Sequence, residues 1–324
     1  SQSGTPQVEL SSQYNESTQT LHIHFKQSCA ATPGQDQKQA FVIPIRLGLV
    51  GQNGEVLPCQ LAGQAAHNEY LYVLTQAQAS IELVGVPSGA IVSALRDFSA
   101  PVQLQTTYTT EQLTSLMLHD IDPFNRWEAA QRLALSVLLP SIQNSLSAEV
   151  IAERQAQLIQ AFGQILQDPQ LDNAFKELML NLPSYAYLAE QLEVIDPQAI
   201  VLAREALKKA ISLALYSNWQ ETAVKTQSHG AYSPDAASAG RRALLGLAYM
   251  HLCNAALEKQ DSVWPGKCLQ TVKTANNLTD RMNAFTALIA AKHPLAQDAA
   301  MHLYENAKSV TVVLDGDAWN DAVK

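Results

Sequence analysis

Basic residues are scarce in this sequence of 324 residues. Its 21 lysines and arginines stand against 30 acidic residues, for a formal net charge of -9. Because binding to a phosphate backbone depends on basic surface, we expect no nucleic-acid partner. No apolar run reaches the roughly 18 residues that cross a bilayer, and the first residues do not form a basic-then-apolar leader. We therefore expect a soluble protein without a membrane partner.

Cysteine is also scarce. Four cysteines are too few and too scattered for a disulfide framework in a chain of this length, and no two form a Cys-x-x-Cys pair. We expect reduced, mostly structural thiols and a cytoplasmic protein, with a periplasmic location as the alternative. The four residues are Cys29, Cys59, Cys253 and Cys268.

Several enzyme motifs are missing from the sequence. It contains no Gly-x-Gly-x-x-Gly, no Walker loop, no Gly-x-Ser-x-Gly and no His-Glu-x-x-His. Motifs therefore point to none of the enzyme classes that carry them. The opening Ser1-Gln2-Ser3-Gly4-Thr5-Pro6 has no initiator methionine, and we interpret the chain as a fragment of a larger polypeptide.

Residues 7 to about 105 show the alternation of β-strands. Leu21, Ile23 and Phe25 alternate with polar neighbours, so they should face a core. Asn53-Gly54 between apolar runs predicts a hairpin, because both turn positions favour positive φ. About seven short strands with regular turns are typical of a β-sandwich. Further strands are expected at Phe41–Val50 (broken by Pro44), Tyr70–Leu74, Ser80–Val84, Ala90–Leu95 and Val102–Tyr108.

The pattern changes at Arg96-Asp97-Phe98-Ser99-Ala100-Pro101-Val102. Apolar residues alternate before this stretch and recur at helical spacing after it. We predict a short stiff hinge here, between a β-sandwich linker domain at residues 1–105 and an α-helical domain at residues 106–324. Each part is long enough to bury a core of its own.

Helix starts in the second part share one signature. A capping oxygen precedes a proline at the first helical position, where the missing N–H costs nothing. Apolar stripes at helical spacing follow these starts. The expected starts are Asp122-Pro123, Asp168-Pro169, Asp196-Pro197 and Ser233-Pro234; the stripes are Trp127, Ala130, Ala134, Val137 and Leu138; Leu171, Phe175, Leu178 and Met179; Ile200, Leu207, Ile211 and Leu215; and Leu244, Leu247 and Met250.

Mostly short loops between these helices predict antiparallel neighbours. Successive helix pairs with one apolar face each are typical of an α-solenoid. The predicted fold class is thus α+β multidomain, an Ig- or fibronectin-like sandwich followed by a superhelical all-α domain. We expect the longest interruption at Ser217–Gly240, the last helix after His293-Pro294, fading near Lys308, and an uncapped tail at Val310–Asp317.

A zinc site is the sharpest chemical hypothesis that spacing allows. His22 and His24 share one strand face, and Cys29 and His67 lie in the same part. No third ligand has diagnostic spacing, so we interpret these histidines as solvent-facing. A second histidine–cysteine pair, His251 and Cys253, lies later in the sequence. These two residues are two positions apart on a predicted helix and do not face one another, which favours core or surface roles.

Two charged clusters are interpreted as structural. His119-Asp120 with Asp122 could be imagined as an acid–base cluster, but its place just before a predicted helix start favours capping. Arg126-Trp127-Glu128 is typical of a charged pair beside a buried aromatic. The sequence therefore assigns no catalytic, cofactor-binding or metal-ligating residue.

Five collinear segments together resemble the C-terminal half of bacterial aminopeptidase N, a zinc-dependent exopeptidase family. They keep the order and spacing of that family up to about residue 305, and the resemblance stops after Ala307. The segments are Ser1–Pro6, Arg96–Val102, Arg126-Trp127-Glu128-Ala129-Ala130-Gln131, Ile195-Asp196-Pro197-Gln198-Ala199-Ile200 and Ala275-Asn276-Asn277-Leu278-Thr279-Asp280.

The resemblance implies a parent with four domains. A thermolysin-like domain there carries Gly-Ala-Met-Glu-Asn and the His-Glu-x-x-His zinc motif, in which zinc polarises the scissile carbonyl and a glutamate serves as general base. Neither motif occurs in this chain, so no catalytic residue and no metal ligand is carried over. This chain would be the linker sandwich and the first part of the helical domain.

The resemblance also implies a role. The chain would brace and cover the catalytic domain of the same polypeptide and restrict entry to short peptides, while being inactive and free of zinc itself. One alternative is a stand-alone solenoid that binds a protein partner. The other is an independent metal or thiol site at His22, His24 and Cys29.

Overall fold

The computed structural model describes residues 2–227 and 230–307. Contacts between residues divide the chain into two compact units, residues 1–133 and 134–324. The first unit contains the strands and the first helical turns that follow them. The division falls inside one helix, α2 (Pro123–Gln143), and the two units are treated separately below.

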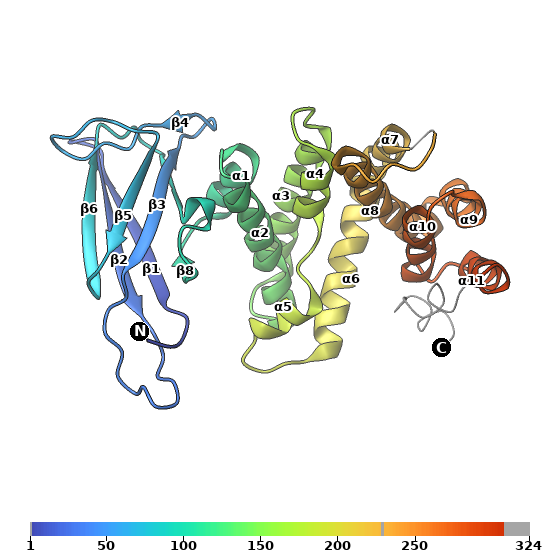
Figure 1. The fold of residues 1–324 in the computed structure, drawn as a ribbon, viewed down its shortest axis with the longest axis horizontal. Coiled ribbons are helices and arrows are strands. Elements are labelled where there is room, and N and C mark those ends of the chain that lie inside the picture. The colour runs from blue at the N-terminus through green and yellow to red at the C-terminus, as the bar shows by residue number, and fades with distance from the viewer. Residues whose placement is uncertain (1, 228–229, 308–324) are drawn as a thin grey trace. The chain divides into compact units, whose positions relative to one another are not determined.

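The first unit is built on two four-stranded sheets (Figure 1). One sheet has the order β6-β2-β1-β8, in which β8 runs parallel to β1 and the other pairs are antiparallel. In the other, β3 pairs with β4, β5 and β7. The strands are β1 (Gln7–Asn15), β2 (Thr20–Ser28), β3 (Ile43–Val50), β4 (Val56–Leu57), β5 (Glu69–Leu74), β6 (Gln78–Val84), β7 (Ile91–Ala94) and β8 (Gln103–Thr106).

The core lies between the two sheets, as the alternation predicts. Leu21, Ile23 and Phe25 on β2 are buried with β3 residues in one apolar cluster. The Phe25 ring stacks on Tyr72 of β5, with centroids 5.0 Å apart. Each such buried side chain contributes about 1.5–3 kcal/mol through removal of apolar surface from water. The predicted sandwich is confirmed.

The hairpin predicted at Asn53-Gly54 is confirmed, although only Gly54 of the two residues has a positive φ. Gly54 has a φ of +84°, and Val50 pairs with Val56 across the turn. A side chain at Gly54 would meet the ring of His119, whose Cγ lies 2.4 Å from an ideal Cβ. Pro44, expected to break the next strand, instead lies inside β3 and pairs with Val73.

The predicted hinge is wrong. Residues 96–102 lie inside the first unit, where Arg96 is completely buried. A short 3-10 turn, η1 (Arg96–Phe98), leads into β8, which joins the first sheet beside β1. A buried charge with fixed partners and a following strand hold this segment inside the first unit, so its change of sequence pattern does not mark the boundary between the two parts.

Two helices begin within the first unit. In α1 (Thr110–His119), the Thr109 side chain accepts from the Gln112 N–H and the Gln112 side chain accepts from the Thr109 N–H, which is a capping box. The next helix, α2, begins at Pro123, as the Asp122-Pro123 pair predicts. Asp122 Oδ1 accepts from the Asn125 N–H at 2.8 Å.

The second unit is helical throughout the part that the structure describes. Its longest helix, α8, contacts α4, α6, α7, α9 and α10, and its buried residues are distributed around much of its circumference. The helices after α2 are α3 (Ala148–Gln167), α4 (Asn173–Leu180), α5 (Tyr185–Glu190), α6 (Pro197–Ala214), α7 (Tyr216–Thr226), α8 (Ala236–Lys259), α9 (Val263–Thr274), α10 (Leu278–Ala290) and α11 (Leu295–Glu305).

The predicted helix starts meet three different outcomes. Asp196 caps α6 before Pro197, as predicted, by accepting from the Ala199 N–H. The start at Ser233-Pro234 is displaced, because Asp235 is the cap and α8 begins at Ala236. The start at Asp168-Pro169 is wrong: Asp168 ends α3, and its carboxylate accepts from the Gln170 N–H in a turn.

Other helical expectations are also settled by the described residues. The interruption predicted at Ser217–Gly240 is wrong at both ends, because α7 occupies Tyr216–Thr226 and α8 begins at Ala236. The last described helix, α11, follows His293-Pro294 as predicted. The fading near Lys308 and the tail at Val310–Asp317 lie outside the described residues.

The stripes are only partly buried. The chosen residues of α6 and Leu215 after it are buried, whereas Leu178 of α4 is 48% exposed. Within residues 2–227 and 230–307, no helix combines the length and apolarity that a membrane crossing requires.

Candidate functional site

The residues of the zinc hypothesis do not gather. His22 Nε2 lies 3.3 Å from Glu82 Oε2, and His24 Nδ1 lies 2.7 Å from Ser80 Oγ, so each ring meets a residue of the neighbouring strand β6. Cys29 Sγ lies 3.9 Å from the Ser3 carbonyl oxygen. No three His, Cys, Asp or Glu side chains of the described ranges are placed to hold a metal ion.

His67, the remaining residue of that hypothesis, is held by its backbone. Its N–H donates to the Cys59 carbonyl oxygen at 3.1 Å, and the Cys59 N–H donates back at 2.7 Å. The Cys59 side chain is buried, which raises the pKa of its thiol to about 11. A thiol with that pKa is a poor ligand and a poor nucleophile at neutral pH.

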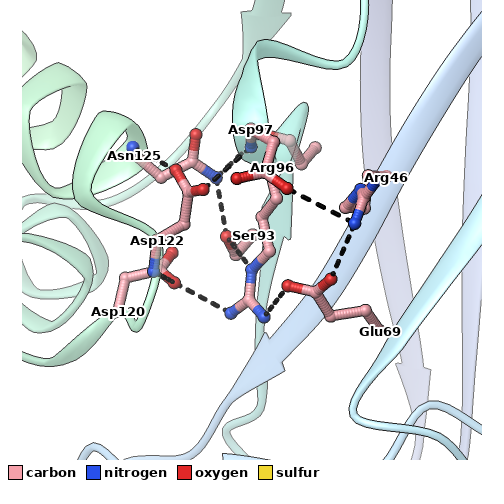
Figure 2. A network of polar contacts seen from close by, with 9 residues as sticks. Arg46, Glu69, Ser93, Arg96, Asp97, Asp120, Asp122 and Asn125 are labelled. Atoms are coloured by element: carbon pink, nitrogen blue, oxygen red, sulfur yellow. Dashed lines mark hydrogen bonds and ion pairs between the residues drawn. The ribbon is translucent and has the colours of Figure 1, made fainter.

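The most concentrated group of charges surrounds Arg96 (Figure 2). Its Nη2 lies 2.8 Å from Asp120 Oδ1, its Nη1 lies 3.3 Å from Glu69 Oε1, and its Nε donates to Ser93 Oγ at 2.9 Å. Both Arg96 and Asp120 have fully buried side chains. Burial raises the pKa of Asp120, and the Arg96 guanidinium opposes this rise. The whole group lies within residues 1–133.

The Arg96 network includes a second arginine, Arg46, and a residue in the first turn of α2, Asn125. Arg46 Nη1 lies 3.4 Å from Glu69 Oε2 and 3.3 Å from Asp97 Oδ2. On the helix side, Asn125 Nδ2 donates to Ser93 Oγ at 2.7 Å. Figure 2 shows these side chains together; they come from β3, β5, β7, η1, the corner before α2 and the first turn of α2.

The backbone at this corner is strained and anchored. Leu95, Asp97 and Phe98 have φ values of 59°, 54° and 49°, in the left-handed region that non-glycine residues rarely occupy. The Asp97 N–H donates to Asp122 Oδ2 at 2.8 Å, while the other oxygen of Asp122 caps α2. Asp122 therefore holds the strained turn against the helix start.

This network provides structure and offers no reactive group. Its buried arginine is neutralised by carboxylates, and its hydroxyl and amide are occupied by hydrogen bonds within the network. Gly48 completes it, because an ideal Cβ there would lie 2.0 Å from Arg96 Cζ. The capping role predicted for Asp122 is confirmed. The role of Asp120 as the partner of Arg96 was not predicted, since 24 residues separate the two in the sequence.

The other charged cluster, Arg126-Trp127-Glu128, lies at the start of α2. Arg126 Nε donates to the Met117 carbonyl oxygen at 2.9 Å and so ties α2 to α1. Trp127 is half-buried and packs at a tilt on Phe124, with centroids 5.8 Å apart. Burial raises the pKa of Glu128, and Arg132 opposes the rise.

His251 is a buried base of the second unit whose pKa is strongly shifted. It is buried and stacked on Trp219, with centroids 4.2 Å apart and planes at 7°. Burial, with a smaller effect of Lys208 and Arg204, lowers its pKa to about 3. Its Nδ1 lies 2.8 Å from Ser212 Oγ. A serine and a histidine at this distance could suggest a nucleophile and its base.

The hydrogen bonds at Ser212 argue against that chemistry. The Ser212 hydroxyl donates to the Lys208 carbonyl oxygen at 2.7 Å, and a hydroxyl has a single hydrogen to donate. Ser212 Oγ also accepts from Asn254 Nδ2 at 3.1 Å. His251 Nδ1 is therefore the donor to Ser212, whereas a catalytic base must accept from the nucleophile. Both residues are buried, so the pair is structural.

Cys253, two residues after His251, lies in the same core. Its Sγ is 3.5 Å from Cys268 Sγ, which joins α8 to α9. The contact with Cys253 and burial raise the pKa of the Cys268 thiol. The prediction of core or surface roles for His251 and Cys253 is thus resolved in favour of the core, and both thiols are free.

A cavity of about 500 Å³ opens beside α4, α8 and α10. Its lining is mixed, with an acidic group, a basic group, amides and hydroxyls beside apolar side chains. Among the lining residues are Glu177, Asn181, Tyr232, Arg242, Leu247 and Asn283. No pattern in the sequence pointed to it, because its charged residues are isolated and 65 positions apart.

Two family models match the chain and together cover most of it. A domain of unknown function described as having an Ig-like fold (DUF3458) matches residues 4–107. A domain of unknown function described as ARM repeats (DUF3458_C) matches residues 110–319. The second match continues past Ala307, where the resemblance was expected to stop.

Curated relatives are similar over almost the whole chain. Aminopeptidase N of Escherichia coli strain K12 is 31% identical over 94% of this chain, and aminopeptidase N of Caulobacter vibrioides is 33% identical over 97%. Aminopeptidase N of Haemophilus influenzae is 29% identical over 90%. The chain spans about a third of the length of these relatives, 34%, 34% and 32% respectively.

A solved structure has the same fold. It is the crystal structure of Legionella pneumophila aminopeptidase A in complex with aspartic acid, with a TM-score of 0.73 and 21% sequence identity. The match covers 99% of this chain and 39% of that one. At this identity the likeness establishes the fold alone.

Proposed function

Because the chain belongs to the DUF3458 family and is homologous to the C-terminal region of aminopeptidase N, we propose that it is a non-catalytic portion of a zinc-dependent aminopeptidase. The parent polypeptide would remove N-terminal residues from peptides in the cytoplasm. The observation that carries this proposal is the extent of the matches, which cover 90–97% of this chain but about a third of each relative.

The described histidines and cysteines named in the zinc hypothesis do not converge on one point. Zinc sites use three or four converging imidazole, thiolate or carboxylate ligands. The side chains of His22, His24 and Cys29 instead contact other partners, and His67 is bonded to Cys59 through its backbone. Metal ligands and the general base would thus belong to another portion of the parent. No catalytic step is assigned to residues described here.

The role proposed for this portion is support and restriction of access. The sandwich at residues 1–105 would act as a linker, and the helices at residues 106–324 would brace and cap the catalytic domain so that only short peptides with free N-termini enter. Firm packing supports this role: the Arg96 network fixes the sandwich corner, and α8 is enclosed by five other helices.

The encoding gene provides the first test. We expect a His-Glu-x-x-His motif encoded upstream in the same reading frame. A reading frame that encodes no such motif would contradict the proposal and favour the alternative, a stand-alone helical module that binds a protein partner. The ARM-repeat description of residues 110–319 is the observation on which that alternative rests.

The second test measures access in the complete gene product. Its hydrolysis of an aminoacyl-arylamide and of a longer peptide is compared with that of a variant lacking residues 110–324. We expect the rate ratio of long to short substrates to rise in the variant, or its zinc content and thermal stability to fall. An unchanged ratio with unchanged zinc and stability would contradict both bracing and restriction.

A further inference from the structure

Arg242 is a buried arginine without an acidic partner. Its side chain belongs to α8, is among the buried charged groups of the chain, and lines the 500 Å³ cavity. Its Nη1 donates to the Ser233 carbonyl oxygen at 2.9 Å, and its guanidinium carbon lies 4.7 Å from the centre of the Tyr232 ring. These contacts orient the group but leave its positive charge uncompensated.

Charge compensation is the usual condition for burying arginine. Buried guanidinium groups in proteins are normally paired with carboxylates or phosphates, since removal from water is costly. Arg96 of this chain follows that rule with Asp120 and Glu69. For Arg242, no acidic side chain of the described ranges lies within ion-pair distance. An anionic group entering the cavity would supply the missing partner.

The same cavity contains an acidic group that is also held in place. Asn181 Nδ2 donates to Glu177 Oε1 at 2.6 Å and to the Glu177 carbonyl oxygen at 3.0 Å. Glu177 lies on α4, which packs closely on α8: an ideal Cβ on Gly240 would lie 2.9 Å from the Ala174 nitrogen. Glu177 and Arg242 line one cavity without forming an ion pair with each other.

The rest of the cavity lining combines apolar side chains of α8 with polar side chains of α10. Leu247 and Met250 of α8 provide apolar surface, and Thr286 and Asn283 of α10 provide hydrogen-bonding groups. The Asn283 amide donates to the Arg242 carbonyl oxygen at 3.0 Å, so α10 is fixed beside the site. The volume lies within the range of about 300–1,000 Å³ that small-molecule sites occupy.

We propose that this cavity binds the zwitterionic backbone of a free amino acid or short peptide. Arg242 receives the carboxylate, Glu177 receives the ammonium group, and Leu247 with Met250 contacts an apolar side chain. A purely anionic ligand would face Glu177, and a purely cationic one would face Arg242, so a ligand with both charges fits best. The inference goes beyond the proposed function and does not depend on it, because it uses residues of this chain alone.

The test is calorimetric titration of the 324-residue chain with four probes. L-leucine and L-alanyl-L-leucine carry both charges; N-acetyl-L-leucine lacks the ammonium group, and L-leucinamide lacks the carboxylate. We expect at least one of the two zwitterions to bind, with one molecule per chain. If L-leucine binds, each blocked leucine should bind at least about tenfold more weakly than L-leucine. If only the dipeptide binds, neither blocked leucine should bind. The stronger of the two zwitterions identifies amino acid or peptide as the ligand.

Variants locate the binding. Arg242→Gln and Glu177→Gln should each weaken the zwitterion at least about tenfold, whereas Arg241→Gln, the neighbouring arginine on α8, should leave affinity unchanged. Should Arg242→Gln melt at a much lower temperature than the parent chain, Ala243→Trp takes its place: it fills the cavity, keeps both charges, and should abolish binding.

Three results would overturn the inference. One is no heat of binding for either zwitterion up to about 10 mM, a concentration that detects weak millimolar affinities. The second is binding of L-leucine with an affinity that a blocked leucine equals. The third is undiminished binding by Ala243→Trp and Glu177→Gln. None of these results bears on whether the chain is part of an aminopeptidase.

Discussion

Arg96 shows how one buried side chain can hold several elements of a fold together. Its guanidinium meets a carboxylate before α2, a carboxylate on β5 and a hydroxyl on β7. Gly48 on β3 leaves the space that it occupies. Removal of one partner from such a buried pair is costly, because it leaves an uncompensated charge away from water.

Replacing Arg96 should destabilise the first unit strongly. Arg96→Met leaves Asp120 buried and unpaired, and we expect the free energy of unfolding to fall by about 3–5 kcal/mol. Arg46→Met is the matched control, since Arg46 shares Glu69 but is 40% exposed, and should cost less than about 1 kcal/mol. Urea denaturation followed by circular dichroism measures both; equal losses would contradict the assigned role.

His251 makes the stability of the second unit depend on pH. Its pKa of about 3 in the folded chain lies below the ordinary 6.5, so between these values the unfolded chain binds a proton that the folded chain does not. The contribution of neutral, buried His251 to the free energy of unfolding is therefore complete above pH 6.5. This contribution is lost as the pH falls toward 3. The expected slope is about 1.4 kcal/mol per pH unit.

A His251→Gln variant isolates this contribution. Glutamine does not titrate, so the difference in free energy of unfolding between parent and variant should shrink as the pH is lowered from 7 to 4. Denaturant melts at several pH values measure that difference. A difference that stays constant with pH would show that His251 is not buried in its neutral form.

At the scale of elements, α8 organises the second unit through close helix contact. At Gly240 the α4 backbone approaches so closely that an ideal Cβ would lie 2.9 Å from Ala174 N and 3.1 Å from Ala174 Cβ. Gly266 on α9 is the opposite case, with open space where a Cβ would be. The same chemical change should thus have opposite effects at the two positions.

Paired glycine substitutions test this packing. Gly240→Ala should destabilise the chain by about 1–3 kcal/mol, because backbone atoms of α4 must move. Gly266→Ala should stabilise it by about 0.5–1 kcal/mol through helix propensity. Thermal denaturation of the two variants gives the signs, and a stabilising Gly240→Ala would show that α4 does not rest on α8 as described.

Sequence patterns predicted elements better than they predicted joints between them. Period-two alternation located β2 and its core face because each residue's side is set locally. Asp196-Pro197 predicted a cap correctly, but Asp168-Pro169 did not, since an aspartate can equally close a turn after a helix. Arg96 was taken for part of a hinge because its partners Glu69 and Asp120 are distant in sequence.

The candidate sites were less predictable than the fold, because their residues are also distant from one another in the sequence. Local spacing suggested His22, His24 and Cys29, which the structure keeps apart. Glu177 and Arg242 meet around a cavity only because α4 packs on α8, and no local pattern records that contact. Buried charges that need partners are visible in tertiary structure, not in periodicity.

The whole chain combines a sandwich unit and a helical unit, and under the proposed function the catalytic centre would lie in another part of the parent polypeptide. The family matches cover residues 4–107 and 110–319, while the aminopeptidase N relatives are about three times as long as the match. The described residues of this chain provide fixed packing and a mixed-charge cavity beside α4, α8 and α10.

The most direct measurement is zinc content and aminopeptidase turnover of the 324-residue chain itself, after incubation with zinc and removal of the excess. The account predicts less than about 0.1 zinc per chain and no release of arylamine from L-alanyl-p-nitroanilide. One zinc per chain together with turnover would contradict it, because the chain would then contain the reactive centre that the account places elsewhere.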